Sequence, residues 1–269
     1  MSDTTTTRVH EDFAEEAAGP SPLQGLKPLV DTLLVTAALF VLWQGLHWLA
    51  GSFVLPSPAE SFARLWEMLT DGRFLPHVAE TALAFGYALA LALAGGLGIG
   101  VLLGAHRLSG AVAEPILIAL YSIPKVTLYP VVLLIFGLGL SSKVAFGAIH
   151  GIIPVIIFTM NAVRTIRPVY LRTARVMRLS PWQTTTRVLL PATVPEVVSG
   201  FRIGFSLTLL GTLIGELFAS SSGVGFVLMR AMGTHDVETI MAVAVLLFAF
   251  AVAASSFLLW LDGRLHRRT

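Results

Sequence analysis

Six stretches of mostly apolar residues, separated by polar connections, run along the 269 residues of the chain. Each is long enough for a helix that crosses the hydrocarbon core of a bilayer, which takes about 20 residues. Lipid offers no partners to backbone N–H and C=O groups, and the alternation typical of barrel strands is absent, so these stretches are predicted to be helices. The pattern therefore predicts an all-α membrane protein with about six transmembrane helices. The predicted spans are 29–50, 80–105, 111–138, 144–163, 195–219 and 239–261.

Composition supports this assignment. Apolar residues make up 55% of the chain and charged residues 13%, and the mean hydropathy is +0.79. Such a chain is too apolar for a surface that faces water. Residues 1–28 are polar and lack the basic start and cleavage site of a secretory signal, so we expect a disordered cytoplasmic tail followed by one membrane domain over 29–265.

The third apolar stretch determines the predicted topology. It contains Pro124, Lys125 and Pro130, so it is either one bent span or two short ones. Positive charge favours the cytoplasmic side, and a polar insert from Arg164 to Val194 holds six arginines without any Asp or Glu. One bent span with both termini in the cytoplasm places this insert inside and leaves only Arg64, Arg73, Lys143 and Arg230 outside. We therefore predict six spans with cytoplasmic termini.

The residues do not form a recognisable catalytic or nucleotide site. The seven histidines are scattered, and no Gly-x-Ser-x-Gly elbow occurs. Each of the three lysines, Lys27, Lys125 and Lys143, follows a residue other than glycine, so the chain has no phosphate-binding loop of the G-x-x-x-x-G-K type. This pattern indicates a protein that is not an enzyme. The net charge of +2 reflects orientation in the membrane, and no nucleic-acid partner is expected.

The insert is predicted to contain a short amphipathic helix from Pro168 to Leu179, because proline suits the first turn of a helix. At about 100° per residue, Arg172, Arg175 and Arg178 share one face. Ser180-Pro181 then indicates a stop and a new start, just before Trp182. Two interpretations remain open. The arginines either fix orientation by touching lipid headgroups, or form a docking surface for a cytoplasmic partner.

A family resemblance enters at these residues. The stretch from Ala174 to Gly204, A-R-V-M-R-L-S-P-W-Q-T-T-T-R-V-L-L-P-A-T-V-P-E-V-V-S-G-F-R-I-G, resembles the E-A-A…G…L-P loop of permease subunits of bacterial ABC importers, more narrowly the nitrate/sulfonate/taurine branch. Other pieces agree in order: L-P-S-P at 55–58, S-I-P-K-V at 122–126, F-G-L-G-L-S-S-K at 136–143, and Gly215-Glu216 ahead of G-V-G at 223–225. The resemblance covers about residues 53–265.

The resemblance implies a type I ABC importer permease fold and a set of partners. These are a second permease chain in a homodimer, two cytoplasmic ABC ATPase subunits that bind ATP and Mg, an external solute-binding protein, and the lipid bilayer of the bacterial inner membrane. The loop 164–194 is implied to couple to the ATPase. The candidate coupling residues are Arg172, Ala174, Arg175, Arg178, Leu179, Ser180, Pro181 and Trp182.

Two departures from the family pattern affect which coupling residues can be inferred from the resemblance. Arg172 stands where the family usually has glutamate, and Arg178 stands at the usual glycine. The first reverses a charge, so either the partner ATPase carries compensating acidic residues or that salt bridge is not used here.

Polar residues inside apolar spans are candidates for the pathway or its gate, since they usually face the interior of the helix bundle. Lys125 either attracts an anionic solute or pairs with Glu114 or Glu216 as a structural lock. The remaining candidates are Ser122, His150, Asn161 and Glu216. For Glu216 we favour a structural or gating role, and for His150 and Asn161 hydrogen bonding between helices. Gly96, Gly100 and Gly104, spaced four apart, favour close helix packing.

The function that follows is a transmembrane permease subunit of an ATP-driven importer. A channel that conducts alone, or a secondary transporter driven by an ion gradient, is the alternative, although neither needs a basic cytoplasmic helix. Nitrate, sulfonates or taurine as the solute are implied by the family only.

Overall fold

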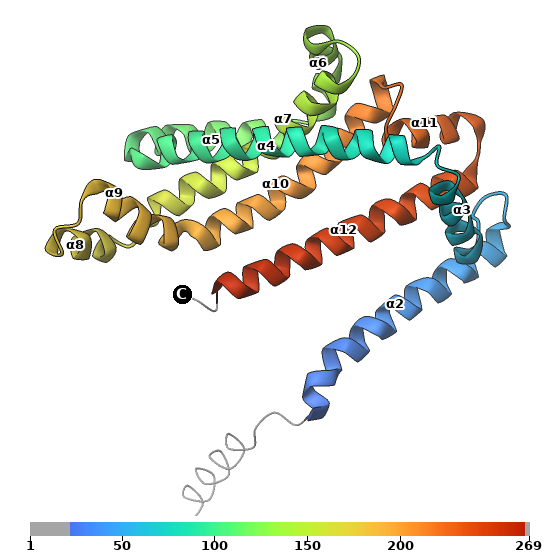
Figure 1. The fold of residues 1–269 in the computed structure, drawn as a ribbon, viewed down its shortest axis with the longest axis horizontal. Coiled ribbons are helices and arrows are strands. Elements are labelled where there is room, and N and C mark those ends of the chain that lie inside the picture. The colour runs from blue at the N-terminus through green and yellow to red at the C-terminus, as the bar shows by residue number, and fades with distance from the viewer. Residues whose placement is uncertain (1–21, 267–269) are drawn as a thin grey trace, which may run out of the picture. The chain divides into compact units, whose positions relative to one another are not determined.

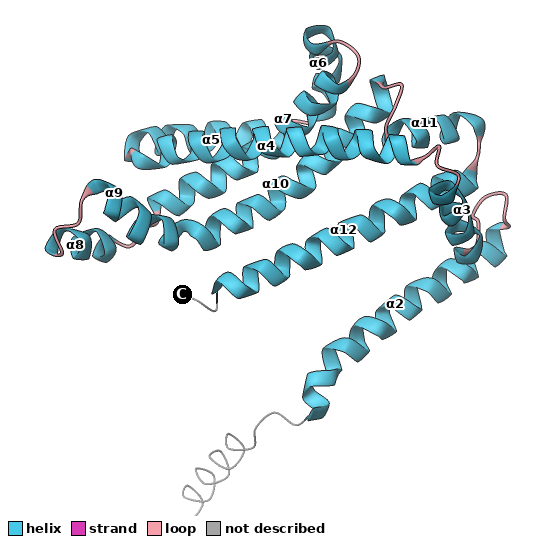
Figure 2. Ribbon diagram, viewed as in Figure 1, coloured by secondary structure: helices cyan, strands magenta, loops and turns pink. Residues whose placement is uncertain are grey.

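A computed structural model describes residues 22–266, and within this range every regular element is a helix (Figure 1). Figure 2 shows the helices joined by short loops. The chain divides into two units with the boundary between Glu60 and Ser61. Five described helices are long and apolar enough to cross a membrane, or six if a bent pair counts as one span. The predicted all-α membrane fold is confirmed. Most of the predicted tail, residues 1–21, lies outside the described residues.

The first unit holds α2, Pro22–Ala50, which begins seven residues before the predicted span and includes the end of the predicted tail. Proline in the first turn of a helix loses no hydrogen bond, so Pro22 is compatible with this earlier start. Two side chains near the end of α2 fasten the turn that follows. Trp43 Nε1 donates to the Pro56 carbonyl at 3.0 Å, and His47 Nδ1 donates to the Leu55 carbonyl at 2.7 Å.

A capping box starts the next helix, α3, Pro58–Thr70. The Ser57 backbone N–H donates to the Glu60 carboxylate at 2.7 Å, and the Glu60 N–H donates to Ser57 Oγ at 3.2 Å. This backbone hydrogen bond from Ser57 holds the pKa of Glu60 below its ordinary value.

The second unit contains the remaining helices. They are α4 Leu75–Ala105, α5 Arg107–Ser122, the 3₁₀ turn η1 Lys125–Leu128, α6 Tyr129–Phe136, α7 Leu140–Arg164, α8 Pro168–Val176, α9 Pro181–Thr184, the π turn η2 Thr185–Leu189, α10 Leu190–Ala219, α11 Val224–Thr234 and α12 Val237–His266. Figure 1 shows α8 and α9 at one end of the long helices α4, α7 and α10, and α11 at the other. We call these the loop end and the far end.

The core of this unit is the contact of α7 with α4 and α10. The predicted glycine stripe of α4 lies against α7: a methyl group at Gly100 would come within 2.6 Å of Thr159 Cβ, and one at Gly104 within 2.8 Å of the Met160 carbonyl. On its other side, α7 meets α10 at Gly151, where a methyl group would overlap Thr208 Oγ1. Small residues let the backbones approach closely, which is how helices gain dispersion energy within lipid.

The third predicted span is broken. Helix α5 ends at Ser122, η1 follows, and α6 leaves at a bend of 83°. Ile123 is extended, with φ −65° and ψ 131°, because a residue that precedes proline is pushed out of the helical region. The structure therefore contains one apolar segment that is interrupted at Pro124. Its two halves, α5 and α6, are far from collinear.

The glycine contact predicts a difference between two alanine substitutions on one helix. Gly100→Ala should destabilise the chain by about 1–3 kcal/mol, because the new methyl group meets Thr159 and a backbone carbonyl at overlapping distances. Gly98→Ala has open space around it and should leave stability unchanged or raised. Thermal unfolding in detergent measures both. Equal melting temperatures for the two variants would contradict the packing.

Candidate functional site

The insert folds as a separate helical loop at the loop end of the second unit. Helix α8 begins at Pro168 as predicted and ends at Val176, earlier than the predicted Leu179. The side chains of Arg172, Arg175 and Arg178 are exposed, whereas Ala174 is 3% exposed. The arginine face thus points outward while the small residue packs beneath the helix.

The end of α8 explains why a glycine is usual at position 178. The Leu179 N–H donates to the Ala174 carbonyl and the Arg178 N–H to the Arg175 carbonyl, both at 3.0 Å. These two bonds form a Schellman motif, whose turning residue adopts the left-handed conformation. Arg178 has φ 49°, so an arginine occupies a conformation that glycine adopts at no steric cost. The replacement of the usual glycine by Arg178 therefore leaves the turn itself intact.

A second capping box begins α9, at the predicted new start. The Ser180 N–H donates to Gln183 Oε1 at 3.0 Å, and the Gln183 N–H donates to Ser180 Oγ at 3.2 Å. Pro181 is the first residue of α9. The π turn η2 then leads without interruption into α10. The last five residues of the predicted loop, 190–194, belong to α10, so the loop is joined directly to a long core helix.

Large apolar side chains stand out from this loop. Trp182 is 76% exposed and Val176 83%. A hollow of about 610 Å³ lies between α8 and the start of α10, and Leu179, Met177 and Val169 are part of its lining. The loop therefore presents arginines, a tryptophan and an apolar hollow together, a surface typical of protein–protein contacts.

The five candidate pathway residues do not gather in one place. Ser122 and Lys125 lie at the break between α5 and α6. His150 and Asn161 are both on α7, eleven residues apart and hence about 16 Å along the helix. Glu216 lies near the far end of α10.

Two of these residues are held by local bonds. His150 Nδ1 donates to the Phe146 carbonyl at 2.8 Å, within α7. Ser122 Oγ donates to the Ile118 carbonyl at 2.9 Å, within α5. The Asn161 side chain borders a polar hollow at the loop end that also contains the ion pair of Arg164 with Glu114.

The alternative that Lys125 pairs with Glu114 or Glu216 is wrong. Lys125 Nζ donates to the Tyr121 carbonyl at 3.1 Å and sits 5.0 Å from the centre of the Tyr121 ring. The broken helix turns Lys125 back onto its own chain. Glu114 instead binds Arg164 at 2.7 Å, and Glu216 faces Lys143 at 3.8 Å.

A buried charge cluster, made of Lys143, Glu216, Glu80 and Thr81, lies at the far end. Lys143 and Glu216 are both fully buried. Lys143 Nζ donates to Glu80 Oε1 at 3.1 Å and to the Ser222 carbonyl at 2.8 Å. Thr81 Oγ1 lies 2.8 Å from the Glu216 carboxylate. The charge pattern of the sequence predicts Lys143 only as a basic residue of the outer side, because no local pattern shows that its amine meets residues about 60 and 80 positions away.

The cluster holds the turn between α10 and α11. The Gly225 N–H donates to Glu216 Oε2 at 2.9 Å, and the Val224 N–H donates to Thr81 Oγ1 at 2.8 Å. Gly223 has φ 111°, and a methyl group there would overlap the Glu216 carboxylate. Glycine is thus required at this turn both by its backbone angle and by the approach of the acid. The result is a clamp that joins α4, α7, α10 and α11.

The apolar spans, with the exposed loop at one end and the buried clamp at the other, are the architecture of a multi-span membrane protein. The chain belongs to the family described as binding-protein-dependent transport system inner membrane component, whose model matches residues 96–269. The resemblance to ABC importer permeases drawn from the loop is thereby confirmed.

Several relatives match most of the chain. The putative aliphatic sulfonates transport permease protein SsuC of Bacillus subtilis is 29% identical over 237 residues, covering 87% of this chain and 85% of its own. A probable ABC transporter permease protein of Haemophilus influenzae is 30% identical over 243 residues, with coverage of 89% and 96%. The nitrate import permease protein NrtB of Synechococcus elongatus is 26% identical over 218 residues, covering 77% of each chain.

A solved structure shares the fold. A chain from inward-facing conformations of the MetNI methionine ABC transporter superposes with a TM-score of 0.59 at 22% identity, covering 72% of this chain and 94% of its own. The type I importer permease fold predicted from the loop is confirmed.

The clamp predicts a strong dependence of stability on Lys143. Lys143→Met leaves Glu216 buried without its counter-charge and should cost about 3–5 kcal/mol. Adding Glu216→Gln should recover part of this loss, since the unpaired charge is then removed. Lys125→Met, at a partly exposed amine bonded to one carbonyl, is the matched control and should have little effect. Equal melting temperatures for Lys143→Met and Lys125→Met would contradict the clamp.

Proposed function

We propose that this permease forms half of the translocation pathway of an ATP-driven importer and couples to a separate ATPase through the loop 164–194. The observation that carries this proposal is the surface of that loop: exposed arginines beside an exposed Trp182 and an apolar hollow, on a segment continuous with α10. A loop that served only to orient the chain would need the charges but not the apolar hollow. ATP and Mg would be bound by the partner.

The proposed assembly follows the family. Two copies of this chain would enclose the pathway in the bacterial inner membrane, with both termini cytoplasmic. An external solute-binding protein would deliver solute to the far end. ATP binding would move the docked loops, and α4, α7 and α10 would rotate together as one packed body between inward-facing and outward-facing states.

We propose a small anion as the solute. Several matching relatives carry names that refer to small anions, namely aliphatic sulfonates, nitrate and bicarbonate. A riboflavin transport permease, RibX of Chloroflexus aurantiacus, is 33% identical over 211 residues, so the fold also serves a larger solute in that relative. A secondary transporter or a channel, the alternative function, would work without an ATPase.

The coupling proposal predicts an asymmetry between removing and reversing a charge on α8. Arg172→Glu and Arg175→Glu should each reduce uptake and ATPase activity by about tenfold or more, because a charge buried against like charges costs several kcal/mol. Arg172→Ala and Arg175→Ala should have smaller effects. Arg178 is not suited to this comparison, since its φ of 49° adds a backbone effect to any substitution.

The measurement uses the complex of this chain with its ATPase and loaded binding protein in proteoliposomes. Arg107→Glu, at an exposed arginine outside the loop, is the control and should leave both activities unchanged. If neither loop reversal changes uptake or ATPase activity, the arginines only orient the chain. Uptake that continues in liposomes without the ATPase would establish the alternative function instead.

A further inference from the structure

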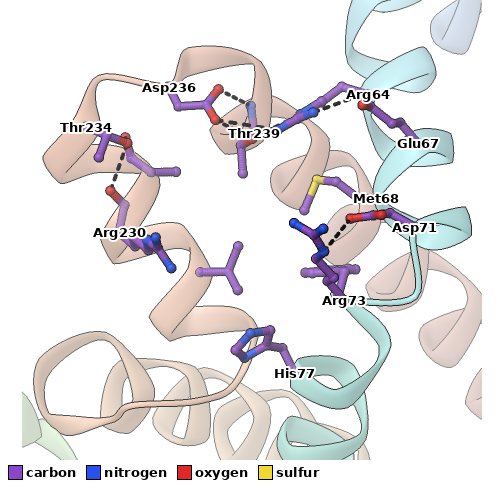
Figure 3. A pocket seen from close by; sticks show the side chains of 13 residues that line it. Arg64, Glu67, Met68, Asp71, Arg73, His77, Arg230, Thr234, Asp236 and Thr239 are labelled. Carbon is purple, nitrogen blue, oxygen red and sulfur yellow. Dashed lines mark hydrogen bonds and ion pairs between the residues drawn. The ribbon is translucent and has the colours of Figure 1, made fainter.

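A separate hollow of about 300 Å³ opens at the far end of the second unit, away from the loop. It lies between α3, the turn that precedes α4, and the helices α11 and α12 (Figure 3). Its polar lining consists of three arginines, three carboxylates, two threonines and a histidine: Arg64, Arg73, Arg230, Glu67, Asp71, Asp236, Thr234, Thr239 and His77.

Two of the carboxylates are hydrogen-bonded by neighbours. Glu67 binds Arg64 Nη1 at 2.7 Å, and this hydrogen bond raises the pKa of Arg64. Asp236 accepts from Thr239 Oγ1 at 2.6 Å and from the Thr239 N–H at 3.0 Å. Burial opposes ionisation of Asp236, but the bonds from Thr239 outweigh it and hold the pKa of Asp236 below its ordinary value. Both acids are already hydrogen-bonded, so they offer little to a cation.

The N–H donors of Arg230 and Arg73, on two other sides of the hollow, are not held by such short hydrogen bonds. Arg230 makes no ion pair with any residue that the structure describes. The Arg73 side chain is 90% exposed. Only its Nε approaches Asp71, at 3.5 Å, so its two terminal nitrogens remain available to bind a ligand. Figure 3 shows Arg73 and Arg230 on opposite sides of the hollow, on different elements.

His77 adds a third donor to the lining. The Gly223 N–H donates to His77 Nδ1 at 3.1 Å, so this nitrogen is an acceptor and the neutral ring carries its proton on Nε2. His77 thus contacts the turn held by the clamp on one side and lines the hollow on the other.

We propose that this hollow binds one small oxyanion between Arg73 and Arg230. The three arginines and three carboxylates cancel in formal charge, so selectivity arises from the uncommitted N–H donors rather than from net charge. Guanidinium groups donate two parallel hydrogen bonds to oxygens in one plane, a geometry that sulfate, sulfonate and nitrate match. A volume of about 300 Å³ holds such an ion with a few waters.

The site lies on this chain alone and does not depend on the ATPase coupling proposed above. Its binding is therefore measured on the full-length chain in lipid nanodiscs, without partners, by calorimetric titration at constant ionic strength. The probes are sodium sulfate, sodium nitrate and sodium methanesulfonate, each against sodium chloride. We expect saturable binding of at least one of the three oxyanions.

Arg230→Gln and Arg73→Gln should each weaken that binding by about tenfold or more, the equivalent of one charge-assisted hydrogen bond. Arg107→Gln, at an exposed arginine outside both the hollow and the loop, is the matched control and should bind as the wild type does. Because the Arg73 side chain is almost entirely exposed, Arg73→Gln should keep the melting temperature, which separates loss of binding from loss of folding.

Three results would overturn the proposal. The first is no saturable binding of any of the three anions by the wild type. The second is undiminished binding by the double variant of Arg73 and Arg230. The third is an absence of anion binding together with weaker association of the double variant with the binding protein, which would make the hollow a docking surface for a protein carboxylate.

Discussion

The close approach of α7 to α4 and to α10 is the constraint on which the rest of the structure depends. At Gly100 and Gly151 there is no room for even one added methyl group, so the helix axes are held at a separation set by backbone contact. Within lipid, such dispersion contacts replace the hydrophobic effect as the source of helix association. Closely packed interfaces shift between discrete arrangements rather than deform continuously. The loop at one end and the clamp at the other are therefore joined by one closely packed body, which we expect to move as a unit.

The clamp completes this body at the far end, where Gly215 lies against the backbone of Lys143. A buried ion pair gives weak net stabilisation, because desolvation of both charges opposes their attraction, but loss of one partner is costly. Lys143 therefore fixes where Glu216 lies, and Glu216 in turn fixes the turn that follows Gly223 by accepting a hydrogen bond from the Gly225 N–H. The function of the pair is positional: it determines how α10 continues into α11, which lies beside the hollow.

The sequence predicted what local patterns determine. Runs of apolar residues placed the spans, proline and the capping residues placed α8 and α9, and the spacing of Gly96, Gly100 and Gly104 indicated the helix contact. The sequence did not predict which residues far apart in the chain contact each other. The position of Lys125 between two prolines of an apolar span suggested a buried cation, but the break in that span lets it bind the Tyr121 carbonyl. Lys143, by contrast, was predicted at the outer surface and is fully buried. The hollow joins Arg73 to Arg230 across more than 150 residues, and neither position has a local pattern that marks it.

The most direct test of the account is whether α4 and α10 stay fixed to each other during the transport cycle. The chain has no cysteine, so spin labels at cysteines introduced for His106, at the loop end of α4, and Ser221, beyond the far end of α10, are specific. Pulsed electron resonance in the assembled complex measures the distance within one chain when doubly labelled chains are diluted in unlabelled ones, and the distance between two chains when every chain carries a label at Ser221 alone. The account predicts the same distance within one chain before and after ATP binding, while the distance between the Ser221 positions of two labelled chains changes. A change of several ångströms within one chain would contradict it.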